Sequence, residues 1–467
     1  MPFLGRCIRL CQLGLVVYLV VAVLFTTFRL FVLPFSALLR SISELSLAAS
    51  EPPSPFSVFS GFFWILQYLA GAMVQDWPWN PERTSTSSSE LSSDSVFWES
   101  SSLALKHGLG QPEPVAVPEA LFLSKAFSNS MHPSRIVPFY YRASGTVDSE
   151  DITITTLITS NRFKVFAQLA ERYEGPISVT IHVENTTTRI SELLNQLHTL
   201  YTSSKSMATH VDVHLVIDSF DRQFNTWRNI ARLFARTNYV MMLDVDFALC
   251  TDFRRAIRKS AKMMGRLREG TSAFVLPAFE YTKLSEGTDQ RNFPKDKKSL
   301  LALIKAGRIG MFHASWAAGH NSTDYDRYYT AKPGEVYKVT QYQSAYEPYV
   351  VFRKDGPPWC DERFVGYGGN KAACLFEMYL SGVSFYVLAD HFIIHQNHLY
   401  EETARKNERK YNRKIYSDFK EETCLRYFKS YHQRNLLNTS SGYNLQSECQ
   451  KIKGVSRLAS QIITEDT

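Results

Sequence analysis

From about residue 150 onward, short apolar runs alternate with segments whose apolar residues have helical spacing. Runs rich in β-branched and apolar residues predict strands over residues 152–159, 177–183, 211–217 and 239–243. Between these runs, apolar residues recur at i, i+3, i+4 and i+7, as in Ile190, Leu193, Leu194 and Leu197. The alternation predicts an α/β fold with a mostly parallel sheet that is flanked by helices on both faces.

Two aspartates, Asp244 and Asp246, follow the fourth predicted strand directly. Ligands of such sheets bind beyond the carboxyl ends of the strands. Carboxylates separated by one residue suit a divalent metal, and a nucleotide diphosphate supplies further oxygen ligands. A second pair, Asp324 and Asp326, has no preceding strand and is interpreted as a solvated loop. The sequence therefore places the metal at Asp244 and Asp246.

The N-terminus carries a predicted membrane anchor. Residues 10–28 contain no charged side chain and form a helix long enough to span about 29 Å, the thickness of a bilayer core. We therefore expect an uncleaved signal-anchor behind a cytosolic tail of residues 1–9, in preference to a cleaved signal peptide. Residues 56–74 are also uncharged and long enough to span. A second span and a docked or re-entrant segment both remain open for them.

Residues 29–148 are expected to form a stem, because the stretch 84–102 is dominated by Ser and Thr and prolines follow it. One folded domain is expected over residues 149–467. N-glycosylation acceptor triplets occur at Asn185, Asn321 and Asn438. Together they favour a lumenal domain and a single-pass type II topology.

Composition narrows the class of protein. Of the 467 residues, 45% are hydrophobic and 21% charged, which is typical of a globular protein. The net charge of +7 comes from scattered Lys and Arg, so nucleic-acid binding is not indicated. The seven cysteines include no CxxC pair, which argues against a structural zinc site. One or two disulfides are expected in an oxidising compartment, with their pairing left open.

A series of short blocks then follows in order between about residues 150 and 425. These blocks are EGPIS (174–178), RN (228–229), DVDF (244–247), VLPAFE (275–280), FPK (293–295), GH (319–320), EPYVV (347–351), DERFVGYGGNK (361–371) and FIIH (392–395). In order and approximate spacing they resemble glycosyltransferase family 49, the family of β-1,4-glucuronyltransferase and of the second catalytic domain of LARGE-type xylosyl/glucuronyltransferases. The resemblance covers neither the stem nor the second apolar segment.

The resemblance implies a GT-A fold, a UDP-sugar donor with UDP-glucuronate among the choices, manganese as the metal and inversion at the anomeric carbon. It also implies a glycan or glycoprotein acceptor and residence in the Golgi membrane or another secretory-pathway membrane. The donor sugar, the acceptor and the linkage stay open. A catalytically silent, lectin-like or scaffold member of the same fold is the alternative, against which the metal motif argues.

Further residues have candidate roles in this site. His395 matches the Ile-His of the family and is a candidate third metal ligand, since imidazole suits manganese. His391 and His398 are weaker candidates. Arg162 and the pair Arg228 and Asn229 are candidates for binding the donor diphosphate. The competing interpretations are a core histidine and solvent-exposed ion pairs.

An inverting transfer needs a carboxylate that takes the proton of the acceptor hydroxyl. Asp361, Glu362 and Glu377 are the candidates, and Asp361 is preferred because it lies beside a glycine-rich turn. Asn370 is expected to cap the helix that follows this turn. At least one of the three carboxylates is expected to be a structural partner of Arg363 or of a surface lysine.

Overall fold

The computed structural model describes residues 95–98, 115–118, 135–219, 222–398, 402–452, 454–455 and 457. The predicted signal-anchor (10–28) and the second apolar segment (56–74) lie outside these residues. In the described part of the chain, no helix combines the length and the apolar character that a membrane span requires.

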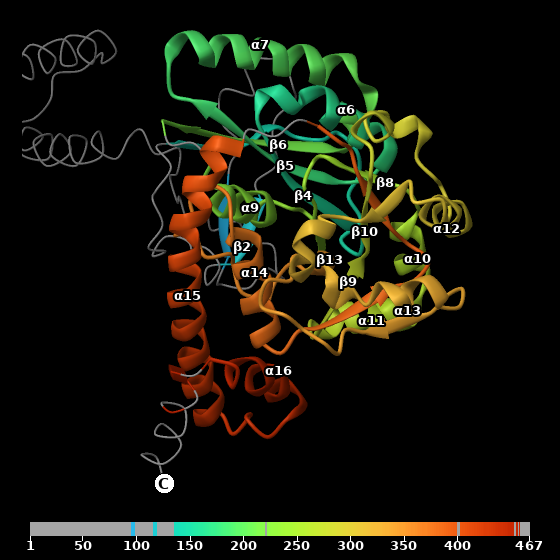
Figure 1. The fold of residues 1–467 in the computed structure, drawn as a ribbon. Coiled ribbons are helices and arrows are strands. Elements are labelled where there is room, and N and C mark those ends of the chain that lie inside the picture. Colours follow the sequence, from blue (N-terminus) through green and yellow to red (C-terminus); the bar gives the residue numbers. More distant parts are fainter. Residues whose placement is uncertain are drawn as a thin grey trace, which may run out of the picture. The chain divides into compact units, whose positions relative to one another are not determined.

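A nine-stranded mixed sheet forms the centre of the fold (Figure 1). Its strands, in spatial order, are β12 (Val336–Lys338), β14 (Ser384–Leu388), β9 (Ser272–Leu276), β13 (Tyr349–Arg353), β7 (Tyr239–Met242), β4 (Ile152–Ile158), β5 (Ile177–Glu184), β6 (Val211–Asp218) and β3 (Arg135–Tyr141). The four predicted strands are β4 to β7, and they pair in parallel. Antiparallel pairs involve β13, β12 and β3. A further parallel pair, between β14 and β9, lies outside the four predicted strands.

The sheet begins earlier in the chain than expected. β3 lies in the predicted stem, yet it pairs antiparallel with β6 and its residues from Val137 to Tyr141 are buried. The fold therefore starts before residue 149. The register shifts between Val137 and Tyr141, around Pro138, and this irregular edge strand lacks the alternation that identifies a strand. Two further strands in the predicted stem, β1 (Ser95–Trp98) and β2 (Val115–Pro118), pair antiparallel with each other.

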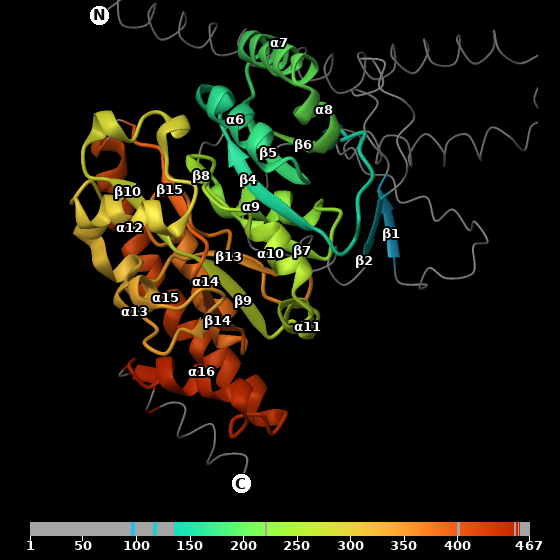
Figure 2. The same ribbon diagram turned by 90° about the vertical axis from the view of Figure 1, so that its right-hand side faces the viewer.

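Helices cover both faces of this sheet (Figure 2). On β6, Leu215 packs in the core beneath α6 and α7, whereas the neighbouring Val216 packs with Trp227 of α9 on the other face. Alternate strand residues are thus buried under different helices, as the predicted two-sided burial requires. The helices are α6 (Phe163–Tyr173), α7 (Thr187–Ser203), α8 (Lys205–His210), α9 (Phe224–Leu233), α10 (Phe253–Lys259), α11 (Ala261–Glu269), α12 (Lys297–Lys305), α13 (Tyr325–Thr330), α14 (Asn370–Leu380), α15 (Glu402–Gln433) and α16 (Ser440–Cys449).

A second, four-stranded sheet brings distant parts of the chain together. Its order is β11 (Ile309–Met311), β10 (Ala278–Tyr281), β15 (Ile393–His395) and β8 (Phe247–Leu249). β15 pairs in parallel with β10 and antiparallel with β8, with His395 opposite Phe247. Short 3-10 helices lie between the elements of the two sheets, at Ser160–Arg162, Leu284–Glu286, Gln290–Asn292, Ala314–Gly319 and Asn321–Thr323.

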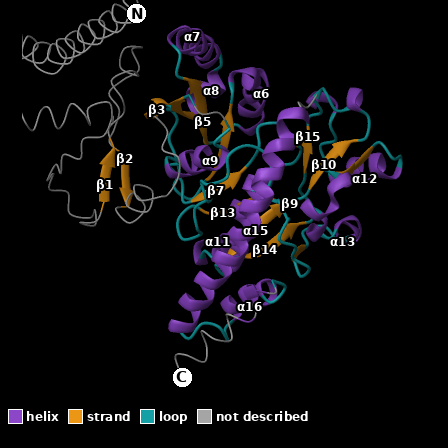
Figure 3. Ribbon diagram, turned by 60° about the vertical axis from the view of Figure 1, so that its left-hand side comes forward, coloured by secondary structure: helices purple, strands orange, loops and turns teal. Residues whose placement is uncertain are grey.

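The C-terminal helices α15 and α16 pack against α14 (Figure 1). Figure 3 shows the long helix α15 leading to α16. The described residues contain two disulfides, and the sequence led us to expect one or two. Cys360–Cys374 ties the loop before the glycine-rich turn to α14, and Cys424–Cys449 ties α15 to α16. Cys250 is buried with a free thiol. Disulfides of this kind form and persist in oxidising compartments.

Candidate functional site

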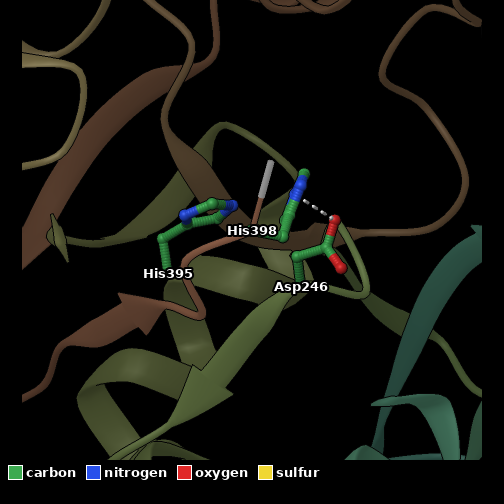
Figure 4. Close-up of side chains that lie close together, drawn as sticks. All are labelled: Asp246, His395 and His398. Carbon is green, nitrogen blue, oxygen red and sulfur yellow. Dashed lines mark ion pairs between the residues drawn. The ribbon is translucent and has the colours of Figure 1, made fainter. Parts of the chain in front are cut away.

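Asp246, His395 and His398 lie together beyond β7, and their ligand atoms are all within 4.8 Å of one another (Figure 4). Asp246 directly precedes β8, and His395 ends β15. The antiparallel pairing of these two strands therefore brings the carboxylate to the imidazole. The Gln396 backbone N–H donates to the Asp246 carbonyl at 2.7 Å, and His398 Nε2 lies 3.3 Å from Asp246 Oδ2.

The surroundings keep His395 in the form that binds a metal. Its side chain is buried, with the rings of Phe312 and Phe247 at centroid distances of 4.9 Å and 5.2 Å. Burial, opposed by the nearby Asp246 carboxylate, lowers the pKa of His395 to about 4. The ring is consequently neutral at neutral pH, and neutral imidazole is the metal ligand.

This donor set fits a divalent transition metal. One carboxylate oxygen and two imidazole nitrogens converge, which suits manganese better than calcium, since calcium takes oxygen ligands. Arg162 lies beside the cluster. Its Nε is 3.5 Å from Asp246 Oδ1, and its Nη2 is 3.2 Å from the ring of His398. The structure thus brings Asp246, His395 and Arg162 together, and it adds His398, the weaker candidate.

Asp244 lies outside this cluster. Its carboxylate accepts hydrogen bonds from the Tyr349 hydroxyl at 2.9 Å, Lys371 Nζ at 3.1 Å and Arg228 Nη2 at 3.4 Å. Burial alone would raise the pKa of this carboxyl, but Lys371 and Arg228 hold it well below its ordinary value. Asp244 is therefore ionised, and it fixes two cations beside the metal cluster. Its role as a metal ligand stays a prediction.

Arg228 and Asn229 diverge although they are neighbours on α9. Arg228 Nη1 donates to Asn370 Oδ1 at 2.8 Å, so the side chain connects Asp244 with the start of α14. Asn229 is buried, and its Oδ1 accepts the Cys360 N–H while its Nδ2 donates to the Cys360 carbonyl and to Glu362. The oxygen and the nitrogen of the Asn229 side-chain amide thus both have partners within the protein. Asn229 thus holds the loop before the glycine-rich turn, and its role in donor binding stays a prediction.

The three predicted catalytic carboxylates all have partners within the protein. Arg363 donates to Asp361 Oδ2 at 2.6 Å from Nη2 and at 2.9 Å from Nε. Glu362 is buried and accepts from Asn229 at 2.6 Å. Glu377 accepts from Arg426 of α15 at 2.8 Å. The partnership with Arg363 that was expected for at least one carboxylate is present at Asp361, whereas Glu362 and Glu377 have other partners. The catalytic roles of all three stay predictions.

The glycine-rich turn allows α15 to approach. Gly366 and Gly368 have φ of 80° and 98°, a left-handed region that favours glycine. A Cβ on Gly368 would lie 3.1 Å from the Cα of Arg409. The expectation for Asn370 needs a correction, because Gly369 is the N-cap of α14 and Asn370 is the first residue of the helix. Its Nδ2 donates back to the Gly366 carbonyl at 2.8 Å, which closes the turn.

Comparison with known proteins assigns the family. The profile of glycosyltransferase family 49, described as "Glycosyl-transferase for dystroglycan", matches residues 151–224 and 218–428. These segments cover more than half of the chain. The protein belongs to glycosyltransferase family 49.

Individual relatives agree with this family. Human (Homo sapiens) xylosyl- and glucuronyltransferase LARGE1 is 29% identical over 274 residues, which cover 58% of this chain and 34% of LARGE1. Mouse (Mus musculus) LARGE2 is 33% identical over 251 residues, which cover 53% of this chain and 34% of LARGE2. The chain thus spans about a third of the length of these relatives. A crystal structure of GalNAc-T7 with UDP, GalNAc and Mn²⁺ covers 52% of this chain and 43% of that chain, at 9% identity and a TM-score of 0.33.

Sequence reasoning gave no role to three residues of the family 49 blocks that line this site. Lys371 and Tyr349 both contact Asp244, and Lys371 Nζ lies over the Tyr349 ring at 3.8 Å. Glu347 accepts the Ala372 N–H at the start of α14. Burial raises the pKa of Glu347, and Lys371 and Arg228 oppose this effect. The sequence signal for these three residues was their place in the family 49 blocks. Their contacts could not be predicted, because they join segments that are far apart in sequence.

The second Asp pair has a structural role. Asp324 is exposed, and its side chain caps α13 by accepting the Arg327 N–H at 3.1 Å. The expectation of a loop is therefore corrected, because Asp324 and Asp326 lie at the start of α13. That the pair lies outside the metal site stays a prediction. Asp324 therefore provides a matched control for substitutions at Asp246.

We expect Asp246→Asn and His395→Ala each to weaken Mn²⁺ binding by at least about tenfold, because each removes a ligand of the cluster. Asp324→Asn should leave Mn²⁺ affinity unchanged. Titration of the purified protein with Mn²⁺, followed by electron paramagnetic resonance, measures these affinities. Asp244→Asn in the same titration tests its predicted ligand role. Equal affinities for Asp246→Asn and the parent protein would contradict the site.

Proposed function

We propose that this protein is a metal-dependent, inverting glycosyltransferase that moves a sugar from a UDP-sugar to a glycan acceptor in the secretory pathway. The observation that carries the proposal is the Asp246, His395 and His398 cluster with three cations around it, in a chain of family 49. These cations are Arg162 beside Asp246 and the pair Arg228 and Lys371 on Asp244. A compact group of positive charge suits a diphosphate leaving group.

Each part of this arrangement has a chemical task. A metal held by Asp246, His395 and His398 would supply positive charge for the departing diphosphate. Arg162 presents a planar guanidinium that can donate to a phosphate oxygen. Asp244 keeps Arg228 and Lys371 at 3.4 Å and 3.1 Å, so that both cations are in position before the donor binds. Such preorganisation avoids rearrangement during the reaction.

The identity of the donor is proposed from the relatives, whose names give xylosyl- and glucuronyltransferase activities. UDP-glucuronate and UDP-xylose are therefore the first donors to test. The GT-A arrangement, manganese and inversion are proposed from the resemblance of the family blocks. Residence in the Golgi membrane as a type II protein is supported by the two disulfides and by the exposed positions of Asn185, Asn321 and Asn438.

A panel of nucleotide-sugars tests the proposed function. The purified protein, with Mn²⁺, should release UDP from one UDP-sugar, and chelation of the metal should abolish this turnover because the diphosphate charge is then unscreened. Asp324→Asn serves as the control, and its turnover should equal that of the parent protein. Metal-dependent binding of a UDP-sugar without turnover on any acceptor would instead support the lectin-like or scaffold member of the fold.

We assign the proton-accepting role to Glu347 in preference to Asp361. The partner of Asp361 is Arg363, which neutralises its charge. Glu347 lies where the charges of Lys371, Arg228 and Asp244 act on it, and the Ala372 N–H orients its carboxylate. Its raised pKa is closer to neutral pH than that of an ordinary glutamate, as suits a general base.

Glu347→Gln should lower kcat by about 100-fold to 10,000-fold with donor affinity near the parental value, since the amide can still accept the Ala372 N–H. As pH falls through the pKa of a base, the base is protonated and the rate declines. This acidic limb should be absent from the pH–rate profile of Glu347→Gln and retained in Asp361→Asn. The reverse pattern would return the role to Asp361.

Glycans are expected on at least two of Asn185, Asn321 and Asn438. All three side chains are exposed in the structure, and the expected lumenal topology presents them to the glycosylation machinery. Treatment of the protein from secretory membranes with an N-glycosidase should increase its electrophoretic mobility, and replacing all three asparagines with Gln should remove that shift. An unchanged mobility of the parent protein would contradict the lumenal topology.

A further inference from the structure

A buried side-chain amide contacts one of the cations of the candidate site. Asn225 lies in the first turn of α9 and is fully buried, and Arg228 follows it by three residues, on the same face of the helix. Arg228 Nη1 donates to Asn225 Oδ1 at 3.0 Å and to Asn370 Oδ1 at 2.8 Å. Nη2 of the same guanidinium lies 3.4 Å from Asp244. One nitrogen of Arg228 is thus held by two amide oxygens, and the other contacts the carboxylate beside the metal cluster.

The other contacts of Asn225 fix the direction of its amide. Its Nδ2 donates to the Asp361 carbonyl at 2.7 Å and to the Asn370 carbonyl at 3.0 Å. A carbonyl oxygen accepts hydrogen bonds and cannot donate them, so the amide nitrogen must face these two groups. The amide oxygen must then face Arg228. The geometry therefore allows one orientation, in which Asn225 presents an acceptor to the guanidinium.

The two amide oxygens that hold Arg228 are neutral. A carboxylate in either place would pair with the guanidinium and compensate its charge, whereas an amide oxygen accepts the hydrogen bond and leaves the charge in place. On the other side, Asp244 is shared between Arg228 at 3.4 Å and Lys371 at 3.1 Å. Two cations thus share one carboxylate, and positive charge remains for an incoming anion.

We propose that Asn225 is a positioning residue for the donor, which acts through Arg228. Its amide oxygen sets the place of the guanidinium, so that Arg228 meets the diphosphate of the nucleotide-sugar without rearranging. This inference rests on the proposed function, in which Arg228 is one of the cations for the diphosphate. A cation that is already held in place loses less conformational freedom when the donor binds, and this raises the affinity.

The competing interpretation is that Asn225 only ties α9 to the loop at Asp361. Other contacts hold that loop independently. Asn229 binds both the N–H and the carbonyl of Cys360, and the Cys360–Cys374 disulfide attaches the loop to α14. Loss of the Asn225 amide should therefore leave the loop in place, and its chief consequence should be a change in the position of Arg228.

The test compares Asn225→Ala with the parent protein in binding UDP in the presence of Mn²⁺, by isothermal titration calorimetry. We expect the variant to bind UDP about tenfold more weakly, because Arg228 loses one hydrogen bond that holds it. The matched control is Asn444→Ala on α16. It removes another buried amide, whose Nδ2 donates to the Tyr379 and Val383 carbonyls, and it should bind UDP as the parent does.

A double-mutant cycle separates positioning from a general effect on the fold. If Asn225 acts through Arg228, Asn225→Ala/Arg228→Gln should bind UDP as Arg228→Gln alone does. A merely structural role would weaken UDP binding by the same factor in both backgrounds, and this result would overturn the proposal. Equal UDP affinities of Asn225→Ala and the parent would overturn it as well, as would an equal loss in Asn444→Ala.

A crystal structure of Asn225→Ala without nucleotide tests the same inference without the donor. The Arg228 guanidinium should have left its place beside Asp244. An unchanged guanidinium would overturn the proposal whether or not the protein binds UDP. Absence of UDP binding by the parent protein would count against the proposed function, and the position of Arg228 would then decide whether Asn225 sets it.

Discussion

β8 and β15 pair antiparallel, with His395 opposite Phe247, and the candidate metal site depends on this pairing. This pairing brings the Asp246 carboxylate close to the His395 imidazole. The hydrogen bond from the Gln396 N–H to the Asp246 carbonyl fixes the position of the two residues along their strands. A shift of one residue in this register would turn His395 to the opposite face of the small sheet. The parallel neighbour β10, with Glu280 opposite His395, holds the strand from the other side.

A second constraint is the balance of charge around Asp244. A partly buried carboxylate is stable when cations and hydrogen bonds compensate it, and Asp244 has both. Its two cations come from α9 and from the start of α14, so one carboxylate connects three segments of the chain. The glycine-rich turn sets the position of Lys371, and α15 covers that turn through Glu408 and Asn412. Hydrogen bonds thus connect α15 with the turn, and Lys371, which follows the turn, with Asp244.

Local patterns of apolar residues predicted the part of the fold in which strands and helices alternate. The strands β4 to β7 and the helices between them match the sequence expectation because each has its own apolar period. The position of Asp246 followed from the end of β7, and His395 was a candidate through its block. Contacts between residues that are far apart in the sequence could not be predicted from it. The sequence around Asp361 does not show which of the three carboxylates Arg363 pairs with. Asn229 contacts the Cys360 backbone only in the folded protein. The irregular edge strand β3 has no clear period, so the sheet was expected to begin later.

The central claim is that Asp246, His395 and His398 hold the metal that serves the donor diphosphate. The most direct measurement is the anomalous difference density at the manganese absorption edge, from crystals of the protein grown with Mn²⁺ and UDP. The account predicts one strong peak within coordination distance of the Asp246 carboxylate and the imidazoles of His395 and His398, next to the diphosphate. A peak at Asp324 and Asp326, or a diphosphate-bound peak that neither histidine contacts, would contradict it.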